Sequence, residues 1–98
     1  MPSTEAWTPE PGEILSIGDL VRRARLCLEN AFTDVWVEAE VSGLKIPASG
    51  HAYFTLSDGL SQVRAVCFRA TLRLLDYPPR EGEKALVRGR FTVYEAQG

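Results

Sequence analysis

Residues 35–68 read VWVEAEVSGLKIPASGHAYFTLSDGLSQVRAVCF, and this stretch decides the fold. Small apolar residues occupy every second position at its start: Val35, Val37, Ala39 and Val41. The positions between them are polar or aromatic. An alternation with a period of two is typical of a strand that is buried on one face. We therefore predict a first strand over residues 35–45.

Two further strands are predicted in the same stretch, over residues 51–57 and 62–68. Residues 46–50 (IPASG) separate the first two strands, because Pro fixes one backbone dihedral and Gly permits positive φ. Alternation then resumes in both strands, so that aliphatic residues share one face with Phe54 and polar or aromatic residues share the other. The dipeptide Asp58-Gly59 between the strands indicates a hairpin turn, since both residues tolerate left-handed backbone conformations.

The chain after residue 68 predicts one connector and one more strand. Residues 70–76 (ATLRLLD) are rich in helix formers, and Pro78-Pro79 prevents any longer helix. A short helix or turn is therefore expected there. Apolar residues recur over residues 84–94, where Gly89 marks a bend or a close backbone approach. We predict a fourth strand over that range.

A helix is predicted ahead of the strands, over residues 17–31. Ser16 and Asp19 have the spacing of a capping box, in which side chains satisfy the unpaired N–H groups of a helix start. Apolar residues then recur at a spacing of three and four, so one face of this helix should pack on apolar surface. Its three arginines, Arg22, Arg23 and Arg25, are either a solvated outer face or a phosphate-binding patch.

The order of elements predicts the architecture. A helix, three meandering strands, a short connector and a fourth strand form the front of a five-stranded Greek-key barrel, the OB-fold. The predicted class is all-β with an N-terminal helix, truncated before the fifth strand. The 98 residues suffice for one small domain. We place a mobile tail at residues 1–13, which are rich in Pro, Ser, Thr and Glu, and an incomplete OB-fold domain at 14–98.

Charge and cysteine usage limit the classes of function. With 11 Lys and Arg against 13 Asp and Glu, the net charge is −2, so any site for a polyanion must be local. The two cysteines and one histidine lack the spacing of a zinc site or a disulfide framework, which fits a reducing cytoplasm. The sequence contains no apolar run of the ~20 residues needed for a spanning helix. We therefore expect a cytoplasmic protein without a membrane partner.

Several motifs resemble one known family. In chain order these are LSIGDL, VWVEAEVSGLK, SGHAYFTLSD and LVRGRFTVYEAQG, which together cover roughly residues 14–98. They are similar to the amino-terminal domain of the large subunit of exodeoxyribonuclease VII. The resemblance implies a bacterial OB-fold module that binds single-stranded DNA for an exonuclease, a hydrolase that degrades single strands to oligonucleotides together with a small subunit. It also implies that the nuclease domain follows residue 98.

Binding a single strand without reading its sequence requires aromatic faces on which bases stack and cations that follow the phosphates. The predicted alternation places such residues on the outer face of the first three strands or in the loops around it. The candidate nucleic-acid-binding residues are Trp36, Lys45, Ser49, His51, Tyr53, Arg64, Phe68 and Arg69. This assignment requires the small apolar residues of these strands, Val37 and Val63 included, to point inward.

Each candidate also has a purely structural interpretation. Tyr53 is either a stacking platform or a packing partner of Arg64, and Trp36 is either a platform or an aromatic covered by the helix or the tail. Phe68 either stacks a base or closes the barrel mouth. His51 hydrogen-bonds a phosphate or a neighbouring strand. The cations at positions 45 and 69 contact phosphates or are merely solvated.

Carboxylates on the first strand oppose DNA binding. Glu38 and Glu40 share its outer face and should mark the edge of the footprint, unless Glu38 pairs with Arg64 or Arg88 across strands. Two carboxylates on one strand are no metal site, and the sequence shows no nucleophile with a base. We therefore predict no catalytic residue, no metal ligand and no cofactor within these residues.

Two alternatives to the DNA-binding function stay open at this point. The domain either mediates assembly, holding the small subunit or a second copy, or is a transfer RNA-binding OB module of the synthetase type. Without a fifth strand, open sheet edges expose unpaired N–H and C=O groups that recruit other chains. A homo-oligomer formed through strand exchange or edge pairing is therefore a further expectation.

Overall fold

The structure is a computed structural model that describes residues 8–93. The predicted tail falls outside this range at residues 1–7, as does the end of the predicted fourth strand at residue 94. The described residues form two units, each considered by itself. The first contains residues 8–36 and 88–93, and the second is Val37–Val87.

Helix α1 (Ile17–Ala31) belongs to the first unit and begins as predicted. The Ser16 side chain accepts a hydrogen bond from the backbone N–H of Asp19 at 3.0 Å, so Ser16 is the N-cap. The helix ends at Phe32, whose N–H bonds the carbonyl of Leu28. Among the described residues its apolar face is only partly covered: Val21, Ala24 and Leu28 are half-buried, whereas Ile17 and Leu20 are exposed.

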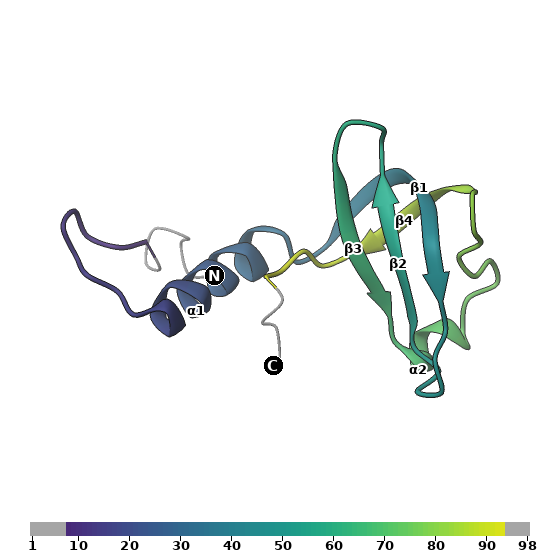
Figure 1. Ribbon diagram of the computed structural model, residues 1–98, viewed down its shortest axis with the longest axis horizontal. Helices are drawn as coiled ribbons and strands as arrows, with labels where there is room; N and C mark the ends of the chain where they lie inside the picture. The colour runs from purple at the N-terminus through teal and green to yellow at the C-terminus, as the bar shows by residue number, and fades with distance from the viewer. Residues whose placement is uncertain (1–7, 94–98) are drawn as a thin grey trace. The chain divides into compact units, whose positions relative to one another are not determined.

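Four strands form one sheet in the described residues, and this sheet is not closed (Figure 1). The strands are β1 (Val35–Lys45), β2 (Ala52–Ser57), β3 (Gln62–Cys67) and β4 (Lys84–Gly89). Their spatial order is β3-β2-β1-β4. Three strands joined in sequence, with a fourth returning beside the first, make a Greek key. The predicted class, mostly β with an N-terminal helix, is confirmed.

A β-bulge sets the register between β1 and β2. Ser42 lies opposite Thr55, but the next paired residue of β1 is Lys45, opposite Tyr53. One extra residue is thus accommodated in β1, where Gly43 has a φ of 61° that favours glycine. The bulge shifts the alternation, so that Leu44 packs against the core while Lys45 shares a face with Tyr53.

The core of the second unit lies on one face of this sheet. Ala52, Phe54 and Leu56 of β2 are buried, together with Ala39 and Val41 of β1. Partly buried side chains from β3, β4 and the connector pack against them. The phase of alternation that we predicted for β2 is therefore confirmed, and Tyr53, between two buried residues, is on the outer face with 39% of its surface exposed.

Two residues predicted to point inward are nevertheless exposed. Val63 lies opposite the buried Leu56, yet it is 41% exposed because β3 is an edge strand of the described sheet. Val37 is 42% exposed because the pairing of β1 with β2 begins only at Glu40. The predicted burial of both valines is therefore wrong. The neighbours that would cover them are missing from the described strands.

Several element boundaries also differ from prediction. β2 begins at Ala52 and β3 ends at Cys67, each one residue inside the predicted range. Helix α2 (Arg69–Leu72) has only four residues, since the N–H groups that follow bond carbonyls three residues back. β4 ends at Gly89, and the chain leaves the sheet where the N–H of Phe91 bonds the carbonyl of Phe32.

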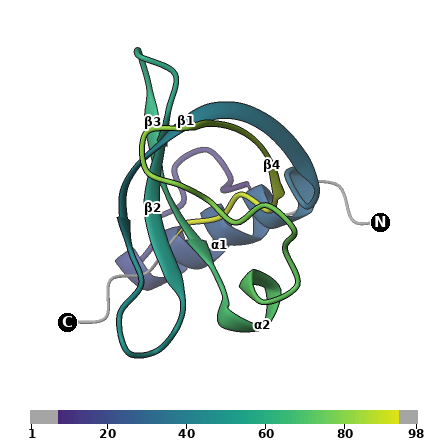
Figure 2. The same ribbon diagram turned by 90° about the vertical axis from the view of Figure 1, so that its right-hand side faces the viewer.

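The β2–β3 hairpin is confirmed, with a loop of residues 58–61. The Asp58 carboxylate accepts hydrogen bonds from the N–H groups of Ser61 at 2.8 Å and Leu60 at 3.0 Å. These bonds hold the pKa of Asp58 below its usual value. Of the two turn residues, only Gly59 adopts positive φ, at 95°. This loop and the β1–β2 loop lie at opposite ends of the strands, and α2 lies at the end of the β1–β2 loop (Figures 1 and 2).

Candidate nucleic-acid interface

An aromatic ring and a cation meet on the outer face of the second unit. Tyr53 on β2 lies directly opposite Lys45 on β1 and Val66 on β3. Directly paired residues of antiparallel strands project from the same face of the sheet. Lys45, Tyr53 and Val66 therefore form one row across three strands, with an exposed ring at its centre. This row exists because the bulge at Gly43 returns Lys45 to the outer face.

The next row supplies hydroxyl groups and a second cation. Ser42, Thr55 and Arg64 are paired across the same three strands, so Arg64 is the diagonal neighbour of Tyr53. Diagonal neighbours remain within reach of long and aromatic side chains. Arg64 is exposed and makes no ion pair with any residue between 8 and 93. Its guanidinium is therefore available to an anionic ligand.

A second group of candidates lies where the β1–β2 loop meets the end of β3. The His51 Nδ1 accepts a hydrogen bond from the Arg69 N–H at 2.9 Å. The rings of His51 and Phe68 are edge to face, with centroids 5.4 Å apart. The Ser49 hydroxyl accepts a longer bond, 3.4 Å, from the N–H of His51. We call Ser49, His51, Phe68 and Arg69 the corner.

The bulge beside the first row is stabilised by a side chain from the far end of the second unit's sequence. Glu81 accepts hydrogen bonds from the N–H groups of Leu44 at 2.8 Å and Gly43 at 3.0 Å. Those two groups are the ones that the irregular ladder leaves unpaired. Backbone bonds between Val41 and residues 82 and 83 hold the same segment in place. Glu81 therefore helps position Lys45, although it lies on neither row.

Carboxylates gather at the opposite, hairpin end of the second unit. A hollow there is lined by Glu38, Glu40, Asp58 and Lys84, with residues 39, 57 and 59 between them. The Lys84 ammonium lies 2.8 Å from the Glu38 carboxylate, and this hydrogen bond lowers the pKa of Glu38. The prediction that Glu38 pairs with Arg64 or Arg88 is therefore wrong. Glu38 pairs with Lys84 and forms no ion pair with Arg64 or Arg88.

Trp36 belongs to the first unit and has a cation over its ring. The Arg88 guanidinium carbon is 5.4 Å from the ring centroid, within the range of a cation–π contact. Arg88 also donates two hydrogen bonds to Asp34, at 2.7 and 2.8 Å. The Asp34 pKa is lowered by this partner. Trp36 is 59% exposed, so its ring is accessible but is already contacted by Arg88.

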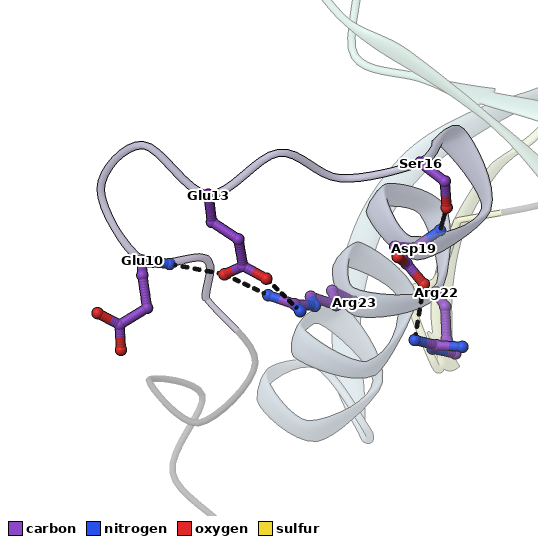
Figure 3. A network of polar contacts seen from close by, with 6 residues as sticks. All are labelled: Glu10, Glu13, Ser16, Asp19, Arg22 and Arg23. Carbon is purple, nitrogen blue, oxygen red and sulfur yellow. Dashed lines mark hydrogen bonds and ion pairs between the residues drawn. The ribbon is translucent and has the colours of Figure 1, made fainter.

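The arginines of α1 are engaged by neighbouring carboxylates, as Figure 3 shows for Arg22 and Arg23; Arg25 lies 3.8 Å from Glu29. Glu13 accepts two hydrogen bonds from Arg23, at 2.7 and 3.1 Å, and one from the N–H of Glu10. Arg22 donates to Asp19 at 2.9 Å. Such pairs neutralise the cations and do not form a phosphate patch. The interpretation of these arginines as a solvated outer face is the better one, and the mobility of the tail stays a prediction.

The candidate residues therefore fall into three places. Lys45, Tyr53 and Arg64 share the outer face, Ser49, His51, Phe68 and Arg69 form the corner, and Trp36 is described with the first unit. Sequence reasoning missed Val66 and Arg88 as neighbours of the candidate rings. The pairing register could have revealed Val66, but no local signal in the sequence points to Arg88.

The described part of the chain offers few other sites. Between residues 8 and 93, no three His, Cys, Asp or Glu side chains come together in a group that could bind a metal ion. The Cys67 thiol packs against the core, and burial raises its pKa, which disfavours the nucleophilic thiolate. Of the helices in that range, none has the length and apolar character to cross a bilayer.

Comparison with known proteins agrees with this geometry. Residues 15–98 match the family described as OB-fold nucleic acid binding domain. A protein of Geobacter sulfurreducens named exodeoxyribonuclease 7 large subunit is 53% identical over 85 residues, which are 87% of this chain and 19% of that protein. Proteins of the same name from Stenotrophomonas maltophilia and Xanthomonas euvesicatoria are 46% identical over 90 residues and 49% identical over 86 residues. These alignments cover 92% and 88% of this chain, and 20% and 19% of those proteins. The chain thus spans about a fifth of the length of the curated relatives it matches.

Proposed function

The chain belongs to the family of OB-fold nucleic acid binding domains, and we propose that it is the single-stranded DNA-binding module of an exodeoxyribonuclease VII large subunit. In this proposal the outer face of the second unit is the binding surface. One observation carries it. The exposed ring of Tyr53 lies between Lys45 and Val66 and is diagonal to Arg64, so a stacking surface and two cations share one face.

The chemistry of that face suits a flexible single strand. A base that stacks on an aromatic side chain contributes roughly 1–3 kcal/mol, and the contact tolerates any base because each has a π-face. Cations on either side of the ring then contact the phosphates that flank the stacked base. A paired duplex cannot offer an unstacked base to Tyr53. Binding should therefore favour single strands over duplex.

Fluorescence anisotropy of a labelled oligothymidylate, titrated with the protein at several salt concentrations, tests the proposal. Two phosphate contacts, from Lys45 and Arg64, predict a slope of log K against log salt of about −1.4, since each contributes roughly −0.7. Duplex DNA of the same length and a ribose oligomer serve as controls. Absence of binding at low salt by the folded protein would contradict the proposal, and preference for the ribose oligomer would favour a transfer RNA-binding module.

The activity of the longer protein is part of the same proposal. The relatives carry the name of an exodeoxyribonuclease, and we infer that a protein containing this chain is a hydrolase that degrades single-stranded DNA to oligonucleotides. The described residues would deliver the strand, and catalysis would be performed by other parts of such a protein. A small subunit of the same enzyme and single-stranded DNA are the partners we propose, in the cytoplasm.

Protein assembly is a second candidate because of one feature, the outer edge of β3. That strand has no neighbour on one side in the described sheet, and Val63 and Val66 are 41% and 42% exposed. Edges of this kind pair with other chains. Sedimentation of the protein with and without oligothymidylate separates the two functions. Assembly predicts a concentration-dependent oligomer that the substitution Val66→Lys disrupts, whereas DNA binding alone predicts a monomer at all concentrations.

A further inference from the structure

Two contacts of the His51 side chain hold the corner together. The Arg69 N–H donates to the imidazole of His51 at 2.9 Å, which joins the start of α2 to the residue before β2. The His51 ring in turn meets the Phe68 ring edge to face at 87°. A backbone bond and a ring contact therefore fix His51 relative to both neighbours.

The bond to Arg69 determines which nitrogen of His51 carries a proton. A neutral imidazole has one donor and one acceptor nitrogen. Because Nδ1 accepts from the Arg69 N–H, the proton of the neutral ring is on Nε2. No residue between 8 and 93 accepts a hydrogen bond from Nε2. The corner thus holds a donor in a defined orientation that is open to an acceptor from outside the described chain.

Gly50 allows the Arg69 side chain to lie close to the β1–β2 loop. A Cβ added at Gly50 would come within 2.8 Å of the Arg69 Cδ, and its φ of 83° also favours glycine. The aliphatic stem of Arg69 therefore packs over the Gly50 backbone. Its guanidinium has no ion pair with a described residue. Arg69 thus supplies a cationic hydrogen-bond donor to the corner, and His51 supplies a neutral one.

We propose that the corner is a nucleotide subsite, in which the Phe68 ring stacks a base and the Arg69 guanidinium and His51 Nε2–H bind the adjacent phosphate. Phe68 is 59% exposed, although it is a large apolar ring that directly follows a strand of the core sheet. Exposed aromatic rings beside cations are the arrangement that single-stranded nucleic acid uses. This proposal rests on the proposed function and adds a second stacking position to that of Tyr53.

In this proposal His51 has two roles: it binds the phosphate, and it positions its two neighbours. Through its Nδ1 it holds the Arg69 backbone, and through its ring edge contact it holds Phe68. The substitution His51→Phe keeps an aromatic ring beside Phe68 but removes both nitrogens. His51→Asn keeps a side-chain oxygen that can accept from the Arg69 N–H but removes the ring and Nε2. Comparing the two variants separates the ring contact from the hydrogen bonds.

Anisotropy titrations of labelled oligothymidylate with the 98-residue protein test the subsite. We expect Phe68→Leu to weaken binding about 5- to 150-fold with an unchanged salt slope, as for a lost stacking contact. Arg69→Gln should reduce the steepness of the salt slope by about 0.7. The matched controls are Tyr77→Leu, at a ring that is 92% exposed in the α2–β4 connection, and Arg80→Gln.

The outcomes distinguish this subsite from the proposed function. If the unchanged protein binds and Tyr53→Leu weakens it, while Phe68→Leu and Arg69→Gln stay within twofold, then the subsite is wrong and the proposed function stands. If the unchanged protein does not bind at low salt, the proposed function itself fails. An NMR spectrum in which the Arg69 amide keeps its shift in His51→Asn and moves in His51→Phe would support the positioning role. Similar shifts in both variants would overturn it.

Discussion

The two ends of the outer sheet face differ in charge although they belong to the same three strands. At the bulged end, Lys45 and Arg64 surround an exposed ring, and the corner adds Arg69. At the hairpin end, Glu38, Glu40 and Asp58 line a hollow where the single cation, Lys84, is paired to Glu38. With a net charge of −2, the chain as a whole would not attract DNA. Charge is thus separated locally within one sheet in a way that composition does not reveal, and the proposed binding surface depends on that separation.

Backbone irregularity accounts for much of this difference. The bulged end depends on Gly43 and on the Glu81 carboxylate that binds two backbone N–H groups. The hairpin end depends on the Asp58 carboxylate, which binds two others. One carboxylate thus stabilises the backbone at each end. The hairpin end also has Glu38 and Glu40 on the outer face. If this contrast determines binding, substitutions at the two ends should have opposite effects.

The largest effect is expected for the ring at the bulged end. Tyr53→Leu should weaken binding to oligothymidylate about 5- to 150-fold, because one stacked base is worth roughly 1–3 kcal/mol. The fold should be preserved, since Tyr53 lies outside the core. Anisotropy titration measures the affinity, and circular dichroism checks the fold. Leu60→Ala in the hairpin loop, where the side chain is 97% exposed, is the control and should bind normally.

A smaller effect is expected from the bulge. Gly43→Ala introduces a Cβ at a φ of 61°, where open space surrounds it but the backbone conformation is unfavourable. The free energy of unfolding should fall by about 1–2 kcal/mol. Urea denaturation measures this change. Gly89→Ala, at a glycine without positive φ, should cost less than about 0.5 kcal/mol, and an equal cost in both variants would argue against a role of the bulge.

The register of β1 also shows what sequence can predict here. Alternation correctly placed Phe54 and Leu56 inside and Tyr53 outside, because a period of two survives in any regular strand. Strict alternation cannot place residues that follow a bulge. Gly43 within the strand was a signal for it, and that signal was readable from the sequence.

Other features depend on partners distant in sequence. The exposure of Val63 follows from β3 being at the edge of the described sheet, and the pairing of Glu38 with Lys84 follows from the position of β4. Alternation assigns a face to each residue but not the neighbour that covers it. The contact of His51 with Arg69 likewise spans 18 positions and has no local signature. Sequence therefore assigned candidate residues to a face of the sheet, but it could not predict how they are grouped.

At the hairpin end, removing a charge should strengthen binding. Glu40→Gln takes away a carboxylate that shares the outer face with Ser42 and Thr55. Affinity for oligothymidylate should rise about two- to fivefold at low salt, the size expected for one exposed charge interaction, and the gain should vanish at high salt. Titrations at two salt concentrations check this. A loss of affinity would mean that DNA contacts the hairpin end directly.

The smallest effect concerns pH and the hairpin loop. Two backbone N–H groups hold the pKa of Asp58 below its usual value, so the carboxylate is favoured in the folded state. Its stabilising effect is present above the ordinary aspartate pKa of about 3.9 and is lost as the pH falls through the lower folded-state value. Asp58→Ala should therefore lower the melting temperature slightly at pH 6, and the difference from the unchanged protein should shrink toward about pH 2. A difference that grows in acid would contradict this account.

The central claim is that single-stranded DNA contacts the bulged end of the outer face and avoids the hairpin end. Titration of oligothymidylate into isotope-labelled protein, followed by NMR, tests it residue by residue. The account predicts that the signals of Lys45, Tyr53, Arg64 and Val66 shift, while those of Glu40, Ser57 and Asp58 stay in place. Shifts concentrated at the hairpin end, or confined to α1, would contradict it.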